Sequence, residues 1–247
     1  MAETYTVEIL IPTARLAFAV HEGRVELMPE HQPPQAYRAY QAFRRRHDVV
    51  GMTTFPNTVL LRGPSTILVD PGIHLQNEPV LAALAARGVW PDDLDLVALT
   101  HAHLDHAGAV GDVVPAALPS GGRPPVAVHA AETGEPHWAA VKSVLEARYL
   151  RLLEGEEGEL AAGITWVRTR GHTQGGVCFR VPTADGLVVL GGDVIGPLAE
   201  DFAALRPPAD EADSEAVLQS WRLIRSWQPA LIIPGHLQPL EATDWHS

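Results

Sequence analysis

The sequence Thr100-His101-Ala102-His103-Leu104-Asp105-His106 places four side chains that can bind metal within six residues. It directly follows residues 94–99, a short apolar run that we expect to form a buried strand. A helix would spread these side chains around its circumference, and a strand would turn His106 to the opposite face from the others. A loop leading into a helix can aim all four at two neighbouring metal ions. Imidazole and carboxylate groups suit zinc, and also iron or manganese.

Three further candidate ligands also follow short apolar runs of the chain. Residues 164–167 lead to Gly171-His172, residues 187–190 lead to Gly191-Gly192-Asp193, and residues 231–233 lead to Pro234-Gly235-His236. Ligands on loops at one edge of a rigid sheet can converge on a point. A lone histidine is usually structural, but the complete set is too large for accident. We therefore predict a metal site built from His101, His103, Asp105, His106, His172, Asp193 and His236.

The composition narrows the class of protein. The chain has 247 residues, 46% of them hydrophobic, which fits one domain over residues 1–247. The single cysteine, Cys178, rules out an intramolecular disulfide and a thiolate metal cage, and we expect it to be buried and inert. A formal net charge of −12 opposes nucleic-acid binding. Pro12 and Arg15 interrupt the apolar stretch at residues 9–20, which therefore predicts a strand rather than a signal peptide or membrane span, and the expected location is the cytoplasm.

The rest of the chain mixes predicted strands and helices without an obvious linker, which predicts one α/β domain. Strands are expected at residues 6–10, 15–20, 58–61, 66–69, 94–99, 126–128, 164–167, 177–181, 187–190 and 231–233, with a hairpin turn at Gly63-Pro64. Helices are expected at residues 79–87, 136–153 and 213–227, and an acidic solvated turn at residues 154–159. Residues 30–48 predict a loop with a short helix, in which Tyr37, Tyr40 and Phe43 either pack or form a flap over the site.

The order of these motifs resembles the metallo-β-lactamase superfamily. His-x-His-x-Asp-His is followed by Gly-His-Thr, Gly-Gly-Asp and Pro-Gly-His, so the resemblance covers about residues 57–236. It implies a four-layer αβ/βα sandwich of two mixed β-sheets flanked by helices. It also implies that one metal is held by His101, His103 and His172, that a second is held by Asp105, His106 and His236, and that Asp193 bridges them. Asp70 matches an early aspartate that orients a ligand histidine.

The resemblance further implies a hydrolase with a small-molecule substrate. Two divalent ions, with zinc preferred over iron or manganese, lower the pKa of a shared water towards about 7, and Asp105 can relay a proton. We expect the substrate to be a small ester, thioester or lactone, although no tyrosine follows Asp193 closely, which weakens the lactonase version. The alternatives are a phosphodiesterase or nuclease, disfavoured by the acidic charge, and a persulfide dioxygenase-like enzyme with one iron, disfavoured by the intact second ligand set. Dimers are common in related enzymes, so a homodimer is compatible.

The remaining histidines fall outside these motifs, and we predict that they are structural or surface groups: His21, His31, His47, His74, His129, His137 and His246. His74 is the exception we expect, because it lies soon after Asp70 and therefore near the edge of the predicted site. The three arginines at residues 44–46 could bind an anionic substrate, but a solvated helix face is the favoured interpretation.

Overall fold

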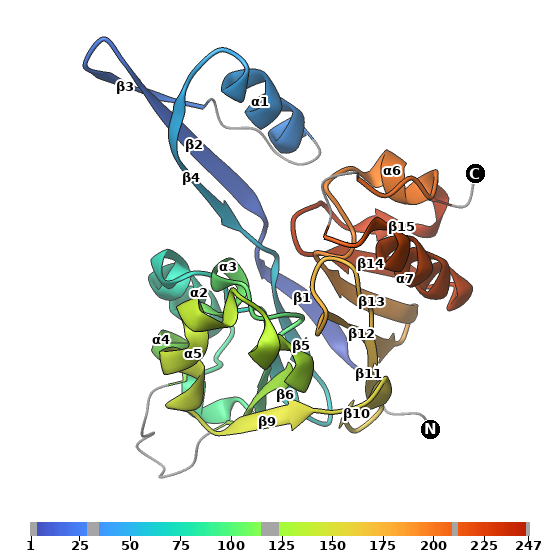
Figure 1. The fold of residues 1–247 in the computed structure, drawn as a ribbon. Helices are drawn as coiled ribbons and strands as arrows, with labels where there is room; N and C mark the ends of the chain where they lie inside the picture. The colour runs from blue at the N-terminus through green and yellow to red at the C-terminus, as the bar shows by residue number, and fades with distance from the viewer. Residues whose placement is uncertain (1–3, 29–34, 115–123, 209–211, 246–247) are drawn as a thin grey trace.

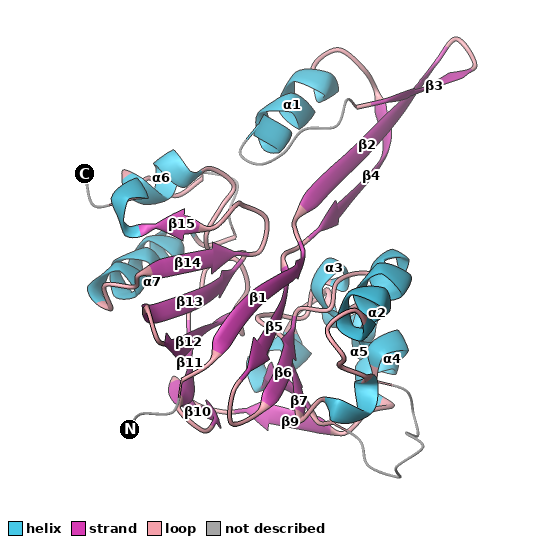
Figure 2. Cartoon of the chain, turned by 180° about the vertical axis from the view of Figure 1, so that it is seen from behind, coloured by secondary structure: helices cyan, strands magenta, loops and turns pink. Residues whose placement is uncertain are grey.

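The computed structural model describes residues 4–28, 35–114, 124–208 and 212–245. Within these ranges two six-stranded mixed sheets pack face to face, and helices cover their outer faces (Figures 1 and 2). The first sheet has the order β1 (Thr6–Ile11), β5 (Thr58–Arg62), β6 (Thr66–Val69), β7 (Leu96–Ala98), β8 (Val126–His129) and β9 (Leu150–Leu153). The second has the order β10 (Glu157–Ala161), β11 (Ile164–Arg168), β12 (Val177–Thr183), β13 (Gly186–Gly192), β14 (Leu231–Pro234) and β15 (Leu240–Glu241). The predicted four-layer αβ/βα sandwich is confirmed.

Three apolar layers hold the sandwich together. Strand β5 shows how, because its alternate residues face opposite sides: Leu60 packs towards the helices and Leu61 towards the second sheet. The helices over the first sheet are α2 (Asn77–Ala85), α4 (Val110–Val113) and α5 (Trp138–Glu146). Over the second sheet, α6 (Ala199–Ala203) and α7 (Ser214–Ser226) contribute the buried Phe202 and Trp221. Strands covered on both faces are apolar throughout, which is why the sequence shows them as uninterrupted runs.

A third sheet extends from the sandwich (Figure 1). Its central strand β2 (Ala14–His21) pairs with β3 (Arg24–Leu27) and β4 (Val49–Phe55). Helix α1 (Gln35–Arg44) covers one face of this sheet and buries Ala17, Ala19 and Phe43 against it. On the other face, side chains such as Leu16 and Phe18 are exposed. We call these three strands and α1 the arm.

Three parts of the predicted secondary structure are wrong. The helix expected over residues 136–153 ends at Glu146, and its last residues form β9, which pairs in parallel with β8. Arg148 donates hydrogen bonds to the carbonyls of Val114 and Gly111, where the chain turns from helix to strand. The acidic turn expected at residues 154–159 runs into β10, which pairs with β11. Strands β3 and β4 of the arm have no counterpart in the prediction.

The other predicted strands and helices are present, with ends shifted by a residue or two. The hairpin at Gly63-Pro64 joins β5 to β6, and Asp213 caps α7 by accepting a hydrogen bond from the Ala216 backbone N–H. Residues 30–34 of the predicted loop lie outside the described residues, and its short helix is α1. None of the helices in the described ranges has the length and apolar character that a membrane crossing requires.

Candidate metal centre

All seven predicted ligands meet at one edge of the sandwich. The first sheet supplies four of them after β7, two in a loop and two in the short helix α3 (Leu104–Ala107). The second sheet supplies the other three after β11, β13 and β14. Their ligand atoms form three groups, each with all atoms within 4.8 Å of one another: His101, His103 and His172; His101, His106 and Asp193; and Asp105, His106 and His236. The first and third groups are the two ligand sets that the resemblance implies.

Asp193 lies between the two sets. Its Oδ1 atom is 3.1 Å from Nε2 of His106, and its Oδ2 atom is 3.3 Å from Nε2 of His236 and 3.7 Å from Nε2 of His172. One carboxylate therefore faces histidines of both sets, as a bridging ligand would.

The donor atoms fit divalent metal ions. Nε2 of His101 is buried and has no hydrogen-bond partner among the described residues. Leaving such an atom unsatisfied costs free energy, which a metal bond at that atom would remove. The surrounding imidazole and carboxylate groups, with no thiolate, suit zinc, iron or manganese.

Two histidines of the first ligand set, His101 and His103, are neutral. Burial, together with the nearby His106, lowers the pKa of His101 well below its usual range. Burial and the neighbouring His172 lower the pKa of His103 to about 4. These imidazoles therefore carry no proton charge at neutral pH and can bind a metal without first losing a proton.

The second ligand set is charged. Burial lowers the pKa of His236, but Asp193 and Asp105 outweigh that effect and raise it to about 9. Burial also opposes the charge on His106, yet Asp193 and Asp70 raise the pKa of His106 well above its usual range. The second set thus forms ion pairs that a metal would replace, with release of protons.

Asp70 supports this centre through contacts with Thr100 and His106. Its backbone has φ of 48°, a left-handed conformation that aspartate tolerates better than most residues. Its Oδ1 accepts a hydrogen bond from the Thr100 backbone N–H at 2.8 Å, and its Oδ2 accepts one from the Thr100 hydroxyl at 2.7 Å. Oδ2 also lies 2.9 Å from Nδ1 of His106, which leaves Nε2 of His106 facing the centre. The predicted contact of Asp70 with a candidate ligand histidine is therefore present, and its orienting role stays a prediction.

Glu132 is a fully buried carboxylate that the sequence analysis did not single out. It accepts hydrogen bonds from the backbone N–H of Ala102 at 2.7 Å and of Gly175 at 3.0 Å. Ala102 lies between the first two ligand histidines, and Gly175 follows soon after His172. Glu132 therefore ties together the two loops that carry the first ligand set.

His137 also lies in this region, as a structural group rather than as a candidate ligand. Its Nε2 is 2.9 Å from a carboxylate oxygen of Glu132, and its ring meets the His103 ring edge-on with centroids 4.2 Å apart. His74, the expected exception, is instead exposed and contacts Asp112. No local pattern distinguishes the two histidines, because the contact with His103 arises only in the folded chain.

Two residues at the base of the arm hold the second ligand set. The Thr54 hydroxyl donates a hydrogen bond to Oδ2 of Asp105 at 2.6 Å. The Asn57 side chain donates to the carbonyls of Pro234 and Leu237, each at 2.7 Å, on either side of His236. The arm and the metal centre are therefore directly connected.

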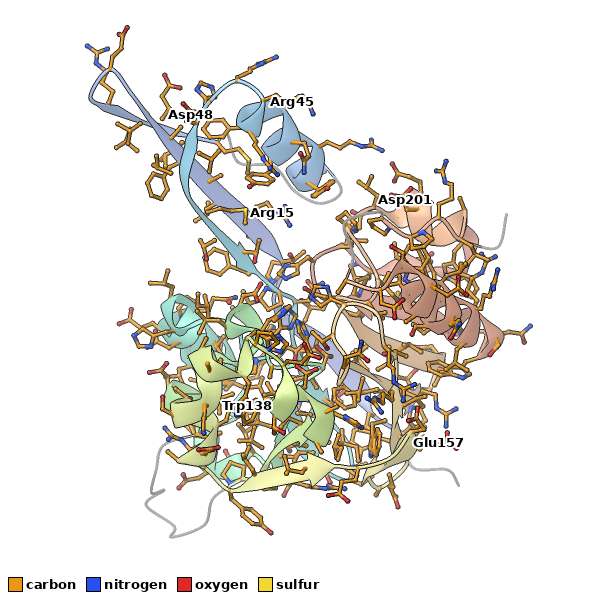
Figure 3. The ribbon with its side chains drawn as sticks, viewed as in Figure 1. Arg15, Arg45, Asp48, Trp138, Glu157 and Asp201 are labelled. Atoms are coloured by element: carbon orange, nitrogen blue, oxygen red, sulfur yellow. The ribbon has the colours of Figure 1, made fainter. Side chains whose placement is uncertain are left out.

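A pocket of about 240 Å³ opens onto the centre. Its lining residues are Arg15, Tyr37, His172, Asp193, Ile195, Gly196, Pro197 and His236. The arm contributes the first two, and Figure 3 shows Arg15 on the inner side of the arm, beneath α1. Arg38 of α1 forms an ion pair with Glu200 of α6. The helix within residues 30–48 thus joins the arm to the second sheet's helices beside the pocket.

Comparisons with known proteins agree with these motifs. A family model described as the metallo-beta-lactamase superfamily matches residues 52–236. Metallo-beta-lactamase domain-containing protein 1 of Xenopus laevis is 29% identical over 199 residues, which cover 74% of this chain and 71% of that protein. The protein of the same name from Homo sapiens is 51% identical over 57 residues, which cover 23% of this chain but only 21% of that protein.

Solved structures share the fold. A quorum-quenching N-acyl homoserine lactone hydrolase superposes with a TM-score of 0.64 and 20% identity, covering 96% of this chain and 93% of that chain. An N-acyl homoserine lactone hydrolase with the product N-hexanoyl-L-homoserine at its catalytic metal centre gives 0.63 and 18%, covering 96% and 94%. A protein in a di-iron-bound form gives 0.55 and 25%, covering 76% and 90%. Because the family model spans most of the sequence, the chain belongs to the metallo-beta-lactamase superfamily, and it is a hydrolase of that fold.

Proposed function

We propose that the protein is a dinuclear metallohydrolase that cleaves a small ester, thioester or lactone. The observation that carries this proposal is the second ligand set, in which ligand atoms of Asp105, His106 and His236 lie within 4.8 Å of one another beside Asp193. A one-metal enzyme has no need of that set, whereas two-metal hydrolysis uses it. Zinc is the proposed metal, with iron or manganese as alternatives.

Two divalent ions at this centre would supply a water of lowered pKa and would polarise the scissile carbonyl. The chain's own residues prepare that chemistry. Asp70 orients His106, and Thr54 holds the carboxylate of Asp105. Burial raises the pKa of Asp105, but the hydrogen bond with His236 and the charge on His106 hold it below its usual range. Asp105 is therefore ionised at neutral pH, and we assign to it the relay of a proton during turnover.

The size of the pocket supports a small acyl substrate. Its volume of about 240 Å³ lies just below the range of roughly 300–1,000 Å³ that drug-sized ligands occupy. Lactone hydrolases are among the solved structures that share this fold. No tyrosine occurs at residues 194–197, but Tyr37 of α1 lines the same pocket as Asp193. A tyrosine thus reaches the pocket from the arm.

The two alternative reactions need different substrates and metals. A phosphodiesterase or nuclease would have to attract a polyanion with a chain of net charge −12. A persulfide dioxygenase-like enzyme would need one iron and would leave the second ligand set without a role. A homodimer and a cytoplasmic location stay predictions.

Metal analysis and a substrate panel test the proposal. Protein purified without chelator is expected to carry about two divalent ions per chain and to hydrolyse members of a panel of esters, thioesters and lactones. Asp193→Ala is expected to lose most activity and at least one metal, whereas Asp185→Ala, at an exposed turn, should lose neither. One iron per chain with oxygen consumption, or turnover of phosphodiesters alone, would replace this proposal by one of the alternatives.

A further inference from the structure

Arg15 lines the same pocket as the candidate ligands His172, Asp193 and His236. It lies on β2 directly opposite Thr54 of β4, so the two side chains share a face of the arm. Thr54 is hydrogen-bonded to Asp105. Arg15 is therefore placed on the arm where the arm meets the metal centre.

Two aromatic rings, rather than an oxygen atom, hold the guanidinium of Arg15. It lies 5.4 Å from the ring centroid of Tyr37 and 5.2 Å from that of Tyr40. In the parts of the chain that the structure describes, no hydrogen bond or ion pair satisfies it, although Arg38 and Arg87 pair with glutamates. Asp193 and Asp105 act on its charge through space. The five N–H donors of this half-buried guanidinium nevertheless have no acceptor in those parts, although buried polar groups are normally hydrogen-bonded. The rings restrain the planar group, and because Arg15 also lines the pocket, its N–H groups are available to a ligand bound there.

We propose that Arg15 selects substrates that carry a carboxylate group. This inference rests on the proposed function: the carboxylate would bind two N–H groups of Arg15, while the ester, thioester or lactone carbonyl lies at the metal centre. A carboxylate matches the planar fork of an arginine and gives a stronger bond than a neutral acceptor. Two divalent ions and Arg15 together also outweigh the charges of Asp105 and Asp193, so the loaded pocket favours an anion although the chain as a whole is acidic.

Matched substrates provide the first test. One is a thioester with a free carboxylate at the far end of its acyl chain, and the other has a carboxamide in place of that carboxylate. Arg15→Met is expected to lower kcat/KM for the carboxylate substrate by about 10- to 100-fold, the range for a lost hydrogen bond to a charged group. For the carboxamide substrate the change should stay within about two-fold. Arg15→Lys keeps the charge without the fork and should give an intermediate loss.

Controls separate recognition from folding. Arg180 also stacks on an aromatic ring, that of Trp227, but lies outside the pocket, so Arg180→Met should leave the ratio between the two substrates unchanged. All variants should keep the metal content and the thermal midpoint of the parent protein. Equal losses on both substrates in Arg15→Met, or an unchanged ratio, would overturn the assignment of Arg15.

A binding measurement distinguishes failure of this inference from failure of the proposed function. Calorimetric titration of the metal-loaded protein with glutarate and with neutral glutaramide should show a preference for glutarate, and Arg15→Met should lower that preference by about ten-fold or more. Binding of this kind without turnover of any ester, thioester or lactone would support the Arg15 subsite and overturn the proposed substrate class. Turnover of such substrates without any preference for a carboxylate would support the proposed function and overturn the Arg15 subsite.

Discussion

The position of Asp193 depends on a neighbouring residue that has no side chain. A Cβ atom on Gly235 would overlap Oδ1 of Asp193 and lie 3.0 Å from Cε1 of His106. The Gly235 backbone cannot move away easily, because its N–H donates to the Gly192 carbonyl and its carbonyl accepts from the Asn57 N–H, each at 2.8 Å. Space, rather than backbone conformation, therefore requires glycine between Pro234 and His236.

Gly235→Ala is expected to displace the Asp193 carboxylate from its place between the two ligand sets. The variant should bind at least one metal fewer per chain, and kcat/KM should fall on the order of 100-fold, as for a misplacement of about 1 Å. Elemental analysis and steady-state kinetics check this. Gly134→Ala is the matched control, because no atom lies within 4 Å of a Cβ there. Full metal content and normal turnover in Gly235→Ala would show that the loop adapts.

Among the elements, the short 3-10 helix η3 (Ala130–Gly134) has a role larger than its length suggests. It follows β8 and places Glu132 between two loops that are distant in sequence but carry the same ligand set. Burial raises the pKa of Glu132, but hydrogen bonds, above all that with His137, keep it below its usual value, so the carboxylate stays ionised. An ionised acceptor is required because backbone N–H groups donate to both of its oxygens.

Glu132→Gln is expected to weaken this connection without changing its shape. The amide nitrogen cannot accept a hydrogen bond, so one backbone N–H is left buried and unsatisfied at a cost of about 1–3 kcal/mol. Metal bound by His101, His103 and His172 should therefore be lost to a competing chelator more readily, and the thermal midpoint should fall. Glu146→Gln, at an exposed helix position, is the control. Unchanged metal affinity in Glu132→Gln would contradict a positioning role for Glu132.

The sequence predicted most elements of the sandwich, together with β2 and α1 of the arm, but not β3 and β4. Buried strands such as β7 and β14 are short apolar runs that are followed within a few residues by a candidate ligand, and these patterns are local. Strand β9 was predicted as helix because Leu150–Leu153 continues the apolar spacing of α5, and only its pairing with β8 decides the matter. Strand β3 is only four residues long, and every position of β3 and β4 is exposed or half-buried, so no buried apolar run marks either strand.

Some residues of the candidate site could likewise be predicted from local motifs, and others could not. The seven candidate ligands were found because each belongs to a short motif, and Asp70 because the resemblance supplied it. Glu132, His137, Thr54 and Arg15 were missed, since each reaches the site across a large sequence separation. Such contacts depend on which loops the two sheets bring together, and a single sequence does not encode that in any local pattern.

In the whole molecule, the metal centre lies across the boundary between the two sheets. One half of the sandwich supplies His101, His103, Asp105 and His106, and the other half supplies His172, Asp193 and His236. Bound ions would therefore link the halves as a crosslink does, in addition to the apolar layer between the sheets. Stability and metal binding should be coupled.

Metal removal is expected to lower the thermal midpoint on the order of 5–10 °C. Free metal at 100 times its Kd contributes about 2.7 kcal/mol, and 1 kcal/mol shifts the midpoint of a chain of this size by about 2–4 °C. The increase in thermal midpoint that bound metal produces should become larger between about pH 6.5 and about pH 9. In the metal-free protein the pKa of His236 is raised to about 9, so the stability from its protonated form is present below about pH 6.5 and lost as the pH rises to about 9. Metal affinity rises over the same range because the ligand must be deprotonated.

Calorimetric scans of metal-loaded and chelator-treated protein at the two pH values check this expectation. Adding the metal back should restore the higher midpoint, which controls for damage by the chelator. A gain that is equal at both pH values, or smaller at the higher one, would mean that the charged second ligand set does not govern metal binding.

The family match begins at residue 52, whereas Arg15, Tyr37 and Tyr40 precede it. For protein engineering, the residues proposed to select the substrate are therefore separate along the chain from the candidate metal ligands. A small combinatorial library at these three positions can explore new substrates while every candidate metal ligand and its supporting carboxylates stay untouched. Such a library must keep the length of β2, because side chains alternate between the two faces of a strand. An insertion or deletion of one residue in β2 ahead of Arg15 would turn Arg15 to the outer face of the arm and Leu16 to the inner one.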